Sequence, residues 1–544
     1  MTLHVRADEA QATVLDDAHI GHINGAFGTI LQHDTGPRRN WAHRLRTMLA
    51  IMGPGLIVMV GDNDAGAFGT YTQAGQNYGT ALLWTLVLLI PVLYVNQEMV
   101  LRLGAVTGVG HARLIFERFG KFWGAFSVID LFLLNGLTIV TEFIGIALAL
   151  DYLGLSKQLG IALAALLIMG AVSTGNFRRF ERFSMVLVFG SLVLVPIFFL
   201  VHPPYADIAH DLLVPQLPAV GKLSDVMLLI IAIVGTTIAP WQLFFQQSYV
   251  IDKRITPRFM KYERADLWFG IVLVVIGAVA MMAFAAAAFA DRPGFGAFTD
   301  AGGVAAGLEA YGGKLPGVLF TIGLIDASLI GASAVSLSTA YAIGDVLSIR
   351  HSLHRKVSDA AGFYVVYAGL IVAAAGIVLT PGAPLGLLTN AVQTLAGVLL
   401  PSATVFLLLL CNDKAVLGPW VNTRLANLFT GAVIAVLVML SVILTASVLF
   451  PEKTTETVMI GILVGGSMLA LVAALLSGVF KEKTRGAWDV FVGNRDLWRM
   501  PPLATLAPAE MSRASKIWML ALRGYLILAG GLVMIRIVTL AIGG

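Results

Sequence analysis

Two aspartates and three glycines interrupt an apolar segment near the start of the chain. The stretch Val60-Gly61-Asp62-Asn63-Asp64-Ala65-Gly66-Ala67-Phe68-Gly69 lies between about Leu49 and about Tyr71, a segment of roughly the length of a bilayer-spanning helix. Ionisable side chains at that depth cost roughly 2.5–3.5 kcal/mol each, and irregular backbone survives there only where protein or a water-filled cavity surrounds it. The stretch predicts a broken helix whose carbonyls and carboxylates face a cation site near the midplane. The alternative is a kinked helix whose aspartates are held by structural hydrogen bonds.

The composition of the whole chain is that of a polytopic membrane protein. It is 58% hydrophobic and only 12% charged, whereas a soluble globular protein carries about 25% charged residues. The single cysteine, Cys411, excludes an internal disulfide and any multi-cysteine metal site. We attribute the net charge of +4 to basic cytoplasmic loops and not to nucleic-acid binding.

Thirteen apolar segments, separated by turn or charge signals, predict membrane spans. Their approximate bounds are 48–72, 79–101, 123–151, 157–174, 183–202, 224–250, 266–290, 316–347, 360–380, 385–411, 425–450, 457–480 and 517–541. Basic clusters alternate with loops that hold few Arg or Lys residues, so the positive-inside rule predicts a cytoplasmic N-terminus. We expect a cytoplasmic tail at 1–45, a ten-helix core at 46–411 and additional C-terminal transmembrane helices at 412–544, with a cytoplasmic loop at about 481–516.

The first ten predicted spans divide into two sets of five, at about 46–203 and 224–411. An odd number of spans per set gives the two sets opposite orientations, as in transporters built from inverted repeats. That symmetry predicts a second broken helix in the sixth span, where the sequence is Gly235-Thr236-Thr237-Ile238-Ala239-Pro240-Trp241-Gln242. Proline removes an amide donor and clashes with the preceding turn. Two interruptions at matching places indicate a transporter binding site.

These motifs resemble the NRAMP family of divalent-metal transporters over roughly residues 45–410. The matching stretches are Gly53-Pro54-Gly55, Asp64 through Phe68, Gln73-Ala74-Gly75, Arg102-Leu103-Gly104 with Thr107-Gly108, Glu142-Phe143-Ile144-Gly145, and Gly235-Thr236-Thr237 with Pro240. The resemblance implies an all-α polytopic membrane protein with a LeuT-like 5+5 inverted-repeat core. It implies broken helices one and six with the metal between them, and about three extra C-terminal helices follow the core.

The chain departs from the motifs of the family at several positions. The family's first-helix motif Asp-Pro-Gly-Asn is here Asp64-Ala65-Gly66-Ala67, and its sixth-helix motif Met-Pro-His-Asn is Ala239-Pro240-Trp241-Gln242. A second histidine of that helix corresponds to Gln246. In the third helix Ile139 stands where the family has an aspartate three residues before Glu142. These losses resemble the divergent NRAMP-related magnesium transporters more than the manganese and iron transporters.

The remaining site candidates are oxygen donors. Asp64 offers a carboxylate, and the resemblance implies backbone-carbonyl ligands near Gly61, Thr236 and Ala239, with Gln393 as a glutamine that can approach the metal. Other candidates for the cavity wall are Asp62, Asn63, Thr237, Ala67 and Gln242. An all-oxygen site removes the preference for soft metals, and magnesium keeps several waters and binds through one or two carboxylates. We expect Mg²⁺ to be favoured and Mn²⁺ to come second, as transported substrate and not as cofactor.

Three further acidic residues lie within predicted spans without a basic residue at similar depth. Asp130 and Glu142 are on the third span and Asp326 is on the eighth. They line a cation vestibule or take part in proton movement, or else they form structural hydrogen bonds. All ten histidines lie in the N-terminal tail, in loops or at the ends of predicted spans, and histidine is the easiest proton relay to build near neutral pH. We therefore expect weak or absent proton coupling.

Taken together, the sequence predicts a divalent-cation transporter that works by alternating access, and not an enzyme. The alternatives are a proton-coupled Mn²⁺ or Fe²⁺ transporter and an amino-acid or organic-solute carrier of the same fold. We expect an integral multi-pass protein of the plasma membrane, the inner membrane of a bacterium. Its partners are a divalent metal cation and the lipid bilayer, with no nucleic acid and no obligate protein partner.

Overall fold

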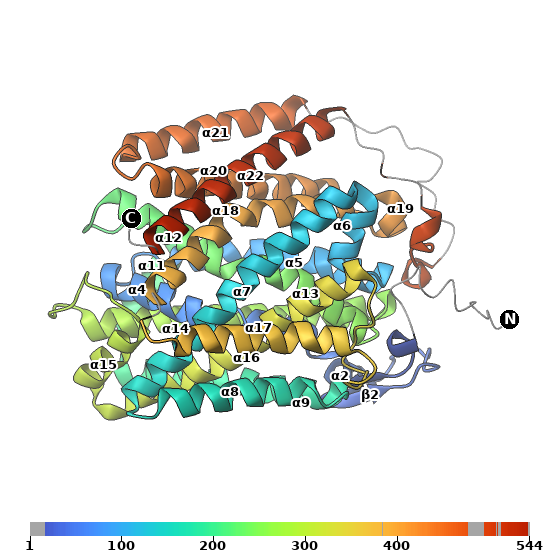
Figure 1. Ribbon diagram of the computed structural model, residues 1–544, viewed down its shortest axis with the longest axis horizontal. Coiled ribbons are helices and arrows are strands. Elements are labelled where there is room, and N and C mark those ends of the chain that lie inside the picture. The colour runs from blue at the N-terminus through green and yellow to red at the C-terminus, as the bar shows by residue number, and fades with distance from the viewer. Residues whose placement is uncertain (1–16, 383–384, 477–493, 507–508, 510–512, 542–544) are drawn as a thin grey trace.

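The computed structural model describes residues 17–382, 385–476, 494–506, 509 and 513–541 of the 544-residue chain, and almost all its regular structure is helical (Figure 1). A two-stranded antiparallel hairpin near the N-terminus is the one sheet among the described residues. It consists of β1 (Ile23–Gly25) and β2 (Gly28–Ile30), in a register that pairs Ile23 with Ile30. The short 3-10 helix η1 (Asp17–His19) precedes it and α2 (Trp41–Ile51) follows it.

The first half of the core contains a helix interrupted near its middle, then seven further helical segments. In chain order it comprises α3 (Pro54–Val60), α4 (Ala65–Tyr78), α5 (Trp84–Thr107), α6 (His111–Phe119), α7 (Lys121–Tyr152), α8 (Lys157–Val172), α9 (Phe177–Gly190), η2 (Ser191–Val193) and α10 (Leu194–Val201). The connecting helix α11 (Tyr205–Leu213) leads to the second half.

The second half of the core repeats the pattern of the first, again opening with an interrupted helix. It comprises α12 (Leu223–Thr237), α13 (Pro240–Asp252), η3 (Pro257–Phe259), α14 (Met260–Phe289), α15 (Ala301–Gly312), α16 (Lys314–Leu347), α17 (Ala361–Leu379) and α18 (Leu385–Cys411). The chain is thus an all-α polytopic membrane protein with a LeuT-like 5+5 core, in which helices one and six are broken.

Additional helices follow the core. They are α19 (Lys414–Leu417), η4 (Gly418–Trp420), α20 (Arg424–Leu449), α21 (Glu456–Leu476), η5 (Arg495–Leu497), η6 (Leu503–Thr505) and α22 (Arg513–Ala541). The helices α20, α21 and α22 lie together along one edge of the molecule (Figure 1). Among the described residues nine helices are long and apolar enough to cross a bilayer, or ten if the bent pair Ala396–Cys411 and Lys414–Trp420 forms one span.

Each of the thirteen predicted apolar segments falls on between one and three of these helical elements. Fewer helices pass the length test because the halves of the first broken helix are short, as are the apolar helix Lys157–Val172 and the apolar stretch Met519–Leu532 of α22, and α18 enters only as part of the bent pair. The predicted tail at 1–45 contains more structure than the sequence suggested, since η1 and the β hairpin pack on the core and α2 begins at Trp41. Residues 1–16 and much of the predicted loop 481–516 lie outside the described residues.

The start of the first broken helix is held by a carboxylate from another helix. The side chain of Asp266, on α14, accepts hydrogen bonds from the amides of Gly53, Gly55 and Leu56 at 3.1, 2.7 and 3.3 Å. The first amides of a helix have no partner within the helix, so these bonds satisfy three of them. A Cβ atom at Gly55 would lie 2.6 Å from the Cα atom of Leu267. The close approach of α3 to α14 therefore requires glycine at this position.

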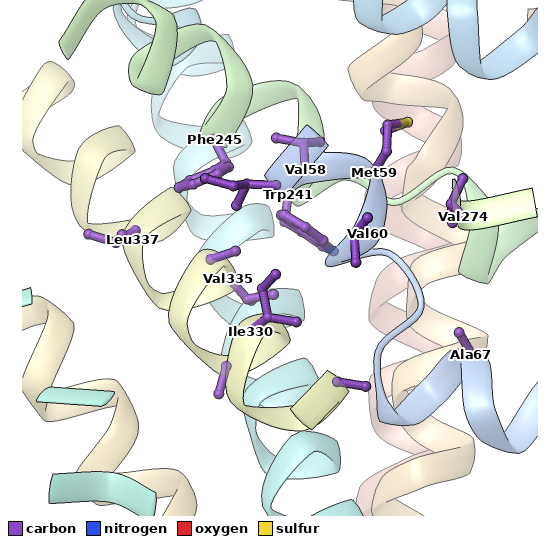
Figure 2. Close-up of a cluster of buried hydrophobic side chains, with 14 of the residues drawn as sticks. Val58, Met59, Val60, Ala67, Trp241, Phe245, Val274, Ile330, Val335 and Leu337 are labelled. Carbon is purple, nitrogen blue, oxygen red and sulfur yellow. The ribbon is translucent and has the colours of Figure 1, made fainter. Parts of the chain in front are cut away.

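Buried apolar side chains fill the space around the first break (Figure 2). Val58 and Val60 of α3 lie beside Trp241 of α13, while Ala67 lies beyond the break on α4. The ring of Trp241 would touch a Cβ atom at Gly61, at 3.6 Å. Ile330, Val335 and Leu337 of α16 face the same cluster. The two broken helices therefore pack directly on one another.

Candidate metal site between the two helix breaks

The first break is a short turn that ends in a helix cap. The amides of Asp62 and Asn63 donate to the carbonyls of Met59 and Val60, at 3.2 and 3.1 Å, and the helical ladder then stops. Asp64 has extended backbone and caps α4, because its Oδ1 atom accepts a hydrogen bond from the Ala67 amide at 2.9 Å. An aspartate at this position satisfies an amide without a helical partner and opposes the positive end of the helix dipole.

The second break lies between Thr237 and Pro240. Ala239 has extended backbone, with φ −94° and ψ 140°, and Pro240 is the first residue of α13, where its missing N–H costs nothing. The carbonyl of Trp241 accepts a hydrogen bond from the Ser338 hydroxyl of α16 at 2.9 Å. The hydroxyls of Tyr71 on α4 and Thr237 lie 2.7 Å apart, and this contact holds the C-terminal end of α12, which carries the negative end of that helix dipole, beside α4.

A cavity of about 50 Å³ lies between the two breaks. Its walls come from α4, α7, α12, α13 and α18, and they contain Asp64, Gly66, Leu134, Thr138, Thr141, Ala232, Gly235, Thr236, Ala239, Pro240, Trp241, Thr389, Val392 and Ala396. A single water needs roughly 10–15 Å³ of such space, so the cavity has room for about three or four waters. Of the site candidates named from the sequence, Asp64, Thr236 and Ala239 lie together on this wall. None of the wall residues is a histidine, cysteine or methionine.

Gly66 allows the polar atoms of this wall to lie close together. A Cβ atom at Gly66 would lie 3.2 Å from Oδ1 of Asp64 and 3.8 Å from the hydroxyl of Thr236. The carboxylate of α4 and the hydroxyl of α12 therefore face the same small volume.

Thr138 and Thr141 of α7 are wall residues that the sequence reasoning did not identify. Their hydroxyls donate to helix carbonyls, Thr138 to Leu134 at 2.9 Å and Thr141 to Thr138 at 2.7 Å. Because the hydroxyl hydrogens are used in this way, the oxygen lone pairs remain as acceptors, which suits a cation or its waters. Their spacing from Asp130 and Leu134, four, four and three residues, places all of them on one face of α7 and was the available signal.

Glu142 lies next to this site although it does not line the cavity. Its Oε2 atom accepts a hydrogen bond from the Ala65 amide at 3.1 Å, and its side chain interacts with the carboxyl group of Asp64. The Oε1 atom has no hydrogen-bond partner among the described residues. A Cβ atom at Gly331 of α16 would lie 2.8–3.0 Å from this carboxyl group. Two buried carboxyl groups so close together favour a proton or a metal cation between them.

The other candidates of the first break point away from the cavity. Asp62 accepts a hydrogen bond from the side chain of Gln242, which in turn accepts one from Gln97 at 2.9 Å. The side-chain amide of Asn63 donates to the carbonyl of Val274 on α14, at 3.0 Å. Gly61 is buried and does not line the cavity.

Of three further candidates, Thr237, Ala67 and Gln393, the first two are not among the residues that line the cavity. Thr237 is hydrogen-bonded to the hydroxyl of Tyr71 at 2.7 Å. Ala67 is fully buried and contributes its backbone amide to Asp64. The side chain of Gln393 lies outside the described residues, although its neighbours Thr389 and Val392 line the cavity.

Asp130 and Asp326 lie away from the cavity. Asp130 lines a second, smaller hollow of about 10 Å³ together with Ser127 and Ser402. Leu134 and Pro240 border both hollows, so the hollow at Asp130 is next to the cavity. Asp326 of α16 instead faces Gly190 of α9, where a Cβ atom would lie 2.3 Å from its Oδ1 atom.

The histidines do not supply ligands to this site. His111, the first residue of α6, is buried and its Nδ1 atom lies 2.9 Å from Oε1 of Gln247. Burial lowers the pKa of His111 to about 4, so the ring is neutral at pH 7. Among the described residues, no group of three or more His, Cys, Asp or Glu side chains is arranged to hold a metal ion. A cation in this cavity would therefore be held by one or two carboxylates, neutral oxygens and water.

Comparison with known proteins gives a consistent result for sequence and fold. A family model described as natural resistance-associated macrophage protein-like (Nramp) matches residues 55–447. The divalent metal cation transporter MntH of Ralstonia nicotianae is 30% identical over 409 residues, which cover 72% of this chain and 89% of that protein. MntH 1 of Pseudomonas aeruginosa is 28% identical over 406 residues, covering 70% and 88%. A crystal structure of a manganese transporter from Eremococcus coleocola superposes with a TM-score of 0.63 at 21% identity, covering 84% and 97%.

Proposed function

Because this chain belongs to the Nramp family, we propose that it transports divalent metal cations across the membrane by alternating access. The observation that carries the proposal is the cavity between the two helix breaks, with the carboxylate of Asp64 and the hydroxyl of Thr236 on its wall. A carboxylate in this position repels the carboxylate of an amino acid, which argues against an organic-solute carrier of the same fold. The cation is the substrate, and the protein acts as a transporter without a resident cofactor.

We propose Mg²⁺ as the preferred substrate and Mn²⁺ as the second. The donors on the wall are all oxygens, and the sulfur and imidazole groups that favour softer metals are missing from it. Mg²⁺ gives up its waters reluctantly and is usually bound through one or two carboxylates with several waters retained. The space for about three or four waters beside a single wall carboxylate fits such a partly hydrated ion.

We further propose that the N-terminus is cytoplasmic, that the protein lies in the inner membrane of a bacterium, and that it needs no obligate protein partner. A negative-inside membrane potential contributes about 2.3 kcal/mol per charge per 100 mV. For a divalent cation this is about 4.6 kcal/mol per 100 mV, so inward transport is favourable without a second driving ion. Asp130 lies on α7 one helical turn before Leu134, which lines the cavity. We assign Asp130 to the path of the hydrated cation.

The second candidate is proton-coupled Mn²⁺ transport, and Glu142 is the observation that favours it. Its carboxyl group contacts Asp64, and one of its oxygens has no partner among the described residues. Arrival of a cation at Asp64 would then displace a proton held between the two groups. The neutral His111 argues against a histidine relay, because its lowered pKa removes it from titration near pH 7.

One assay separates these candidates. Proteoliposomes containing a pH-sensitive dye receive Mg²⁺ or Mn²⁺ outside, under a negative-inside potential. We expect metal influx with a lower half-saturating concentration for Mg²⁺ and little internal acidification. Acidification that scales with influx and disappears in Glu142→Gln would establish the proton-coupled alternative. Absence of uptake for both metals, from protein that is folded and inserted, would overturn the proposed function.

A further inference from the structure

A surface groove of about 640 Å³ lies between the N-terminal hairpin and the beginning of α9. None of its lining residues lines the cation cavity. The groove is lined by Ala26, Phe27, Gly28, Thr29, Arg178, Arg182, Met185, Val186 and Phe189. In Figure 1 the helix α9 lies beside α2 and β2 at the lower edge of the molecule. One wall is thus the loop of the hairpin, and the other wall is a single face of a helix.

The two arginines of the groove are one helical turn apart and are not neutralised. Arg178 donates from Nε to the carbonyl of Gly25 at 3.0 Å and from Nη2 to the carbonyl of Gly28 at 3.2 Å and to the hydroxyl of Thr29, so the hairpin fixes its position and leaves Nη1 for an anion. Arg182 donates only from Nε, to the carbonyl of Ala26 at 3.0 Å, and its terminal nitrogens have no partner among the described residues. Like charges four residues apart on a helix repel each other. An anion between them would remove this repulsion.

The acidic side chain next to these arginines is engaged elsewhere. Glu181 is fully buried, lies 2.6 Å from Nζ of Lys253 and accepts a hydrogen bond from the Ala26 amide at 2.5 Å. In the described part of the chain no carboxylate forms a salt bridge with Arg178 or Arg182. The positive charge of the groove is therefore directed outward.

The far end of the groove is apolar and exposed. Val186 is 69% exposed, Phe189 54% and Phe27 45%, and the rings of Phe27 and Phe189 lie 6.5 Å apart. The helix from Phe177 to Val201 is long and apolar enough to cross a bilayer, so this end faces acyl chains. Arg182 and Phe189 are separated by about 10 Å along the helix axis. The interfacial layer of a bilayer leaflet is about 5–7 Å thick, so the groove spans headgroup and hydrocarbon levels.

We propose that this groove binds an anionic phospholipid of the cytoplasmic leaflet, with its phosphate between Arg178 and Arg182 and its acyl chains over Val186 and Phe189. Guanidinium groups bind phosphate oxygens through paired hydrogen bonds, and anionic lipids concentrate on the cytoplasmic surface. A basic end and an apolar end in one groove match the two ends of a phospholipid. The choice of leaflet rests on the orientation proposed above; the lipid class rests on the two arginines alone.

Native mass spectrometry tests this proposal on the full-length protein in detergent, where no membrane surface potential exists. Phosphatidylglycerol and phosphatidylcholine are added in equal amounts, and the first bound lipid is quantified. We expect the wild-type protein to prefer phosphatidylglycerol by about fivefold or more, because this lipid carries a net negative charge that phosphatidylcholine lacks, and each exposed ion pair with an arginine is worth up to about fivefold in binding. Arg182→Gln should reduce this preference about fivefold, and Arg182→Lys should retain part of it.

The matched control is Arg179→Gln, because Arg179 is exposed on the same helix but does not line the groove. It should keep the wild-type preference. Equal loss in Arg179→Gln, or no preference in the wild-type protein, would overturn the proposal. Displacement of the lipid by millimolar inorganic phosphate would also overturn it, since the site would then bind free anions. Metal uptake by Arg182→Gln in proteoliposomes confirms that the variant is folded.

Discussion

Asp64→Asn separates the two roles that the structure gives to this side chain. Asp64 caps α4 through the Ala67 amide and also presents a carboxylate to the cavity. An asparagine keeps an oxygen that accepts the capping bond, so it should leave the free energy of unfolding nearly unchanged. Alanine removes the cap as well, at a cost of about 1 kcal/mol. Any loss of transport common to both variants therefore reports on the charge.

The size of the effect follows from the chemistry of the cavity. Among the described residues, Asp64 is the one carboxylate on the cavity wall, and removing one member of a buried charged contact costs about 2–5 kcal/mol. Taking about 3 kcal/mol, the half-saturating metal concentration should rise by more than about 100-fold.

The assay is initial Mg²⁺ uptake into proteoliposomes over a wide concentration range, with thermal unfolding of the same samples. Asp300→Asn is the matched control, because Asp300 caps α15 through the Gly303 amide at 2.9 Å, outside the cavity. The control should transport normally. If Asp64→Asn keeps uptake within about threefold of wild type at every concentration, the assignment of Asp64 is refuted.

Three further predictions concern metal selectivity, the free volume beside Asp64 and the pH dependence of stability. Ala239→Met adds a thioether to the wall and should shift competition toward Mn²⁺ or Cd²⁺; unchanged selectivity would contradict the argument from donor type. Gly66→Ala places a methyl group 3.2 Å from the Asp64 carboxylate, and should weaken uptake several-fold while the protein remains folded. Burial lowers the pKa of His351, but its contact with Asp345 at 3.1 Å outweighs burial and raises it. The ion pair of protonated His351 therefore stabilises the fold below about pH 6.5, and this stabilisation is lost as the pH rises through the folded-state pKa. The melting temperature of the wild-type protein should fall over this pH range, and that of His351→Gln should fall less.

The sequence predicts the two helix breaks well because each has a local cause. Glycines with aspartates at 61–66 and a proline at 240 weaken a helix locally, and at both places the helix is in fact broken. The cap at Asp64 and the start of α13 at Pro240 likewise depend on residues that are adjacent in the sequence. The fold class and the position of the cavity between the breaks follow from these local effects and from the symmetry of the spans.

The N-terminal hairpin could not be predicted in the same way. Its strands are three residues long, and an isolated two-stranded hairpin is marginal in water. It is held by partners that lie far away in the sequence, including Arg178, Arg182 and Arg254, which donate to its carbonyls and to those of the residues next to it. Such contacts exist only once the helices have assembled, so the polarity of residues 17–30 indicated a tail.

The directions in which the side chains of the site point could not be predicted from the sequence, for a related reason. Asp62 and Asp64 are two residues apart in an irregular turn, and only the assembled neighbours decide that Asp62 faces Gln242 while Asp64 faces the cavity. The threonines of α7 are on the wall because α7 presents that face to α12 and α18, which is a property of packing. Sequence periodicity gives the stripe on a helix but not the surface against which the stripe lies.

The departures from the family motifs and the threonines on α7 together define how this site would treat a cation. Alanine at 239 removes a soft donor and leaves space, and the hydroxyls of Thr138 and Thr141 offer lone pairs because their hydrogens are used within the helix. Neutral oxygens and water interact with a divalent ion more weakly than additional carboxylates would. On the proposed function, such a site would bind the ion through Asp64, leave much of its hydration shell in place, and so avoid the cost of complete dehydration that makes Mg²⁺ difficult to move. Moderate binding also suits a transporter, since the ion must leave the site as readily as it enters.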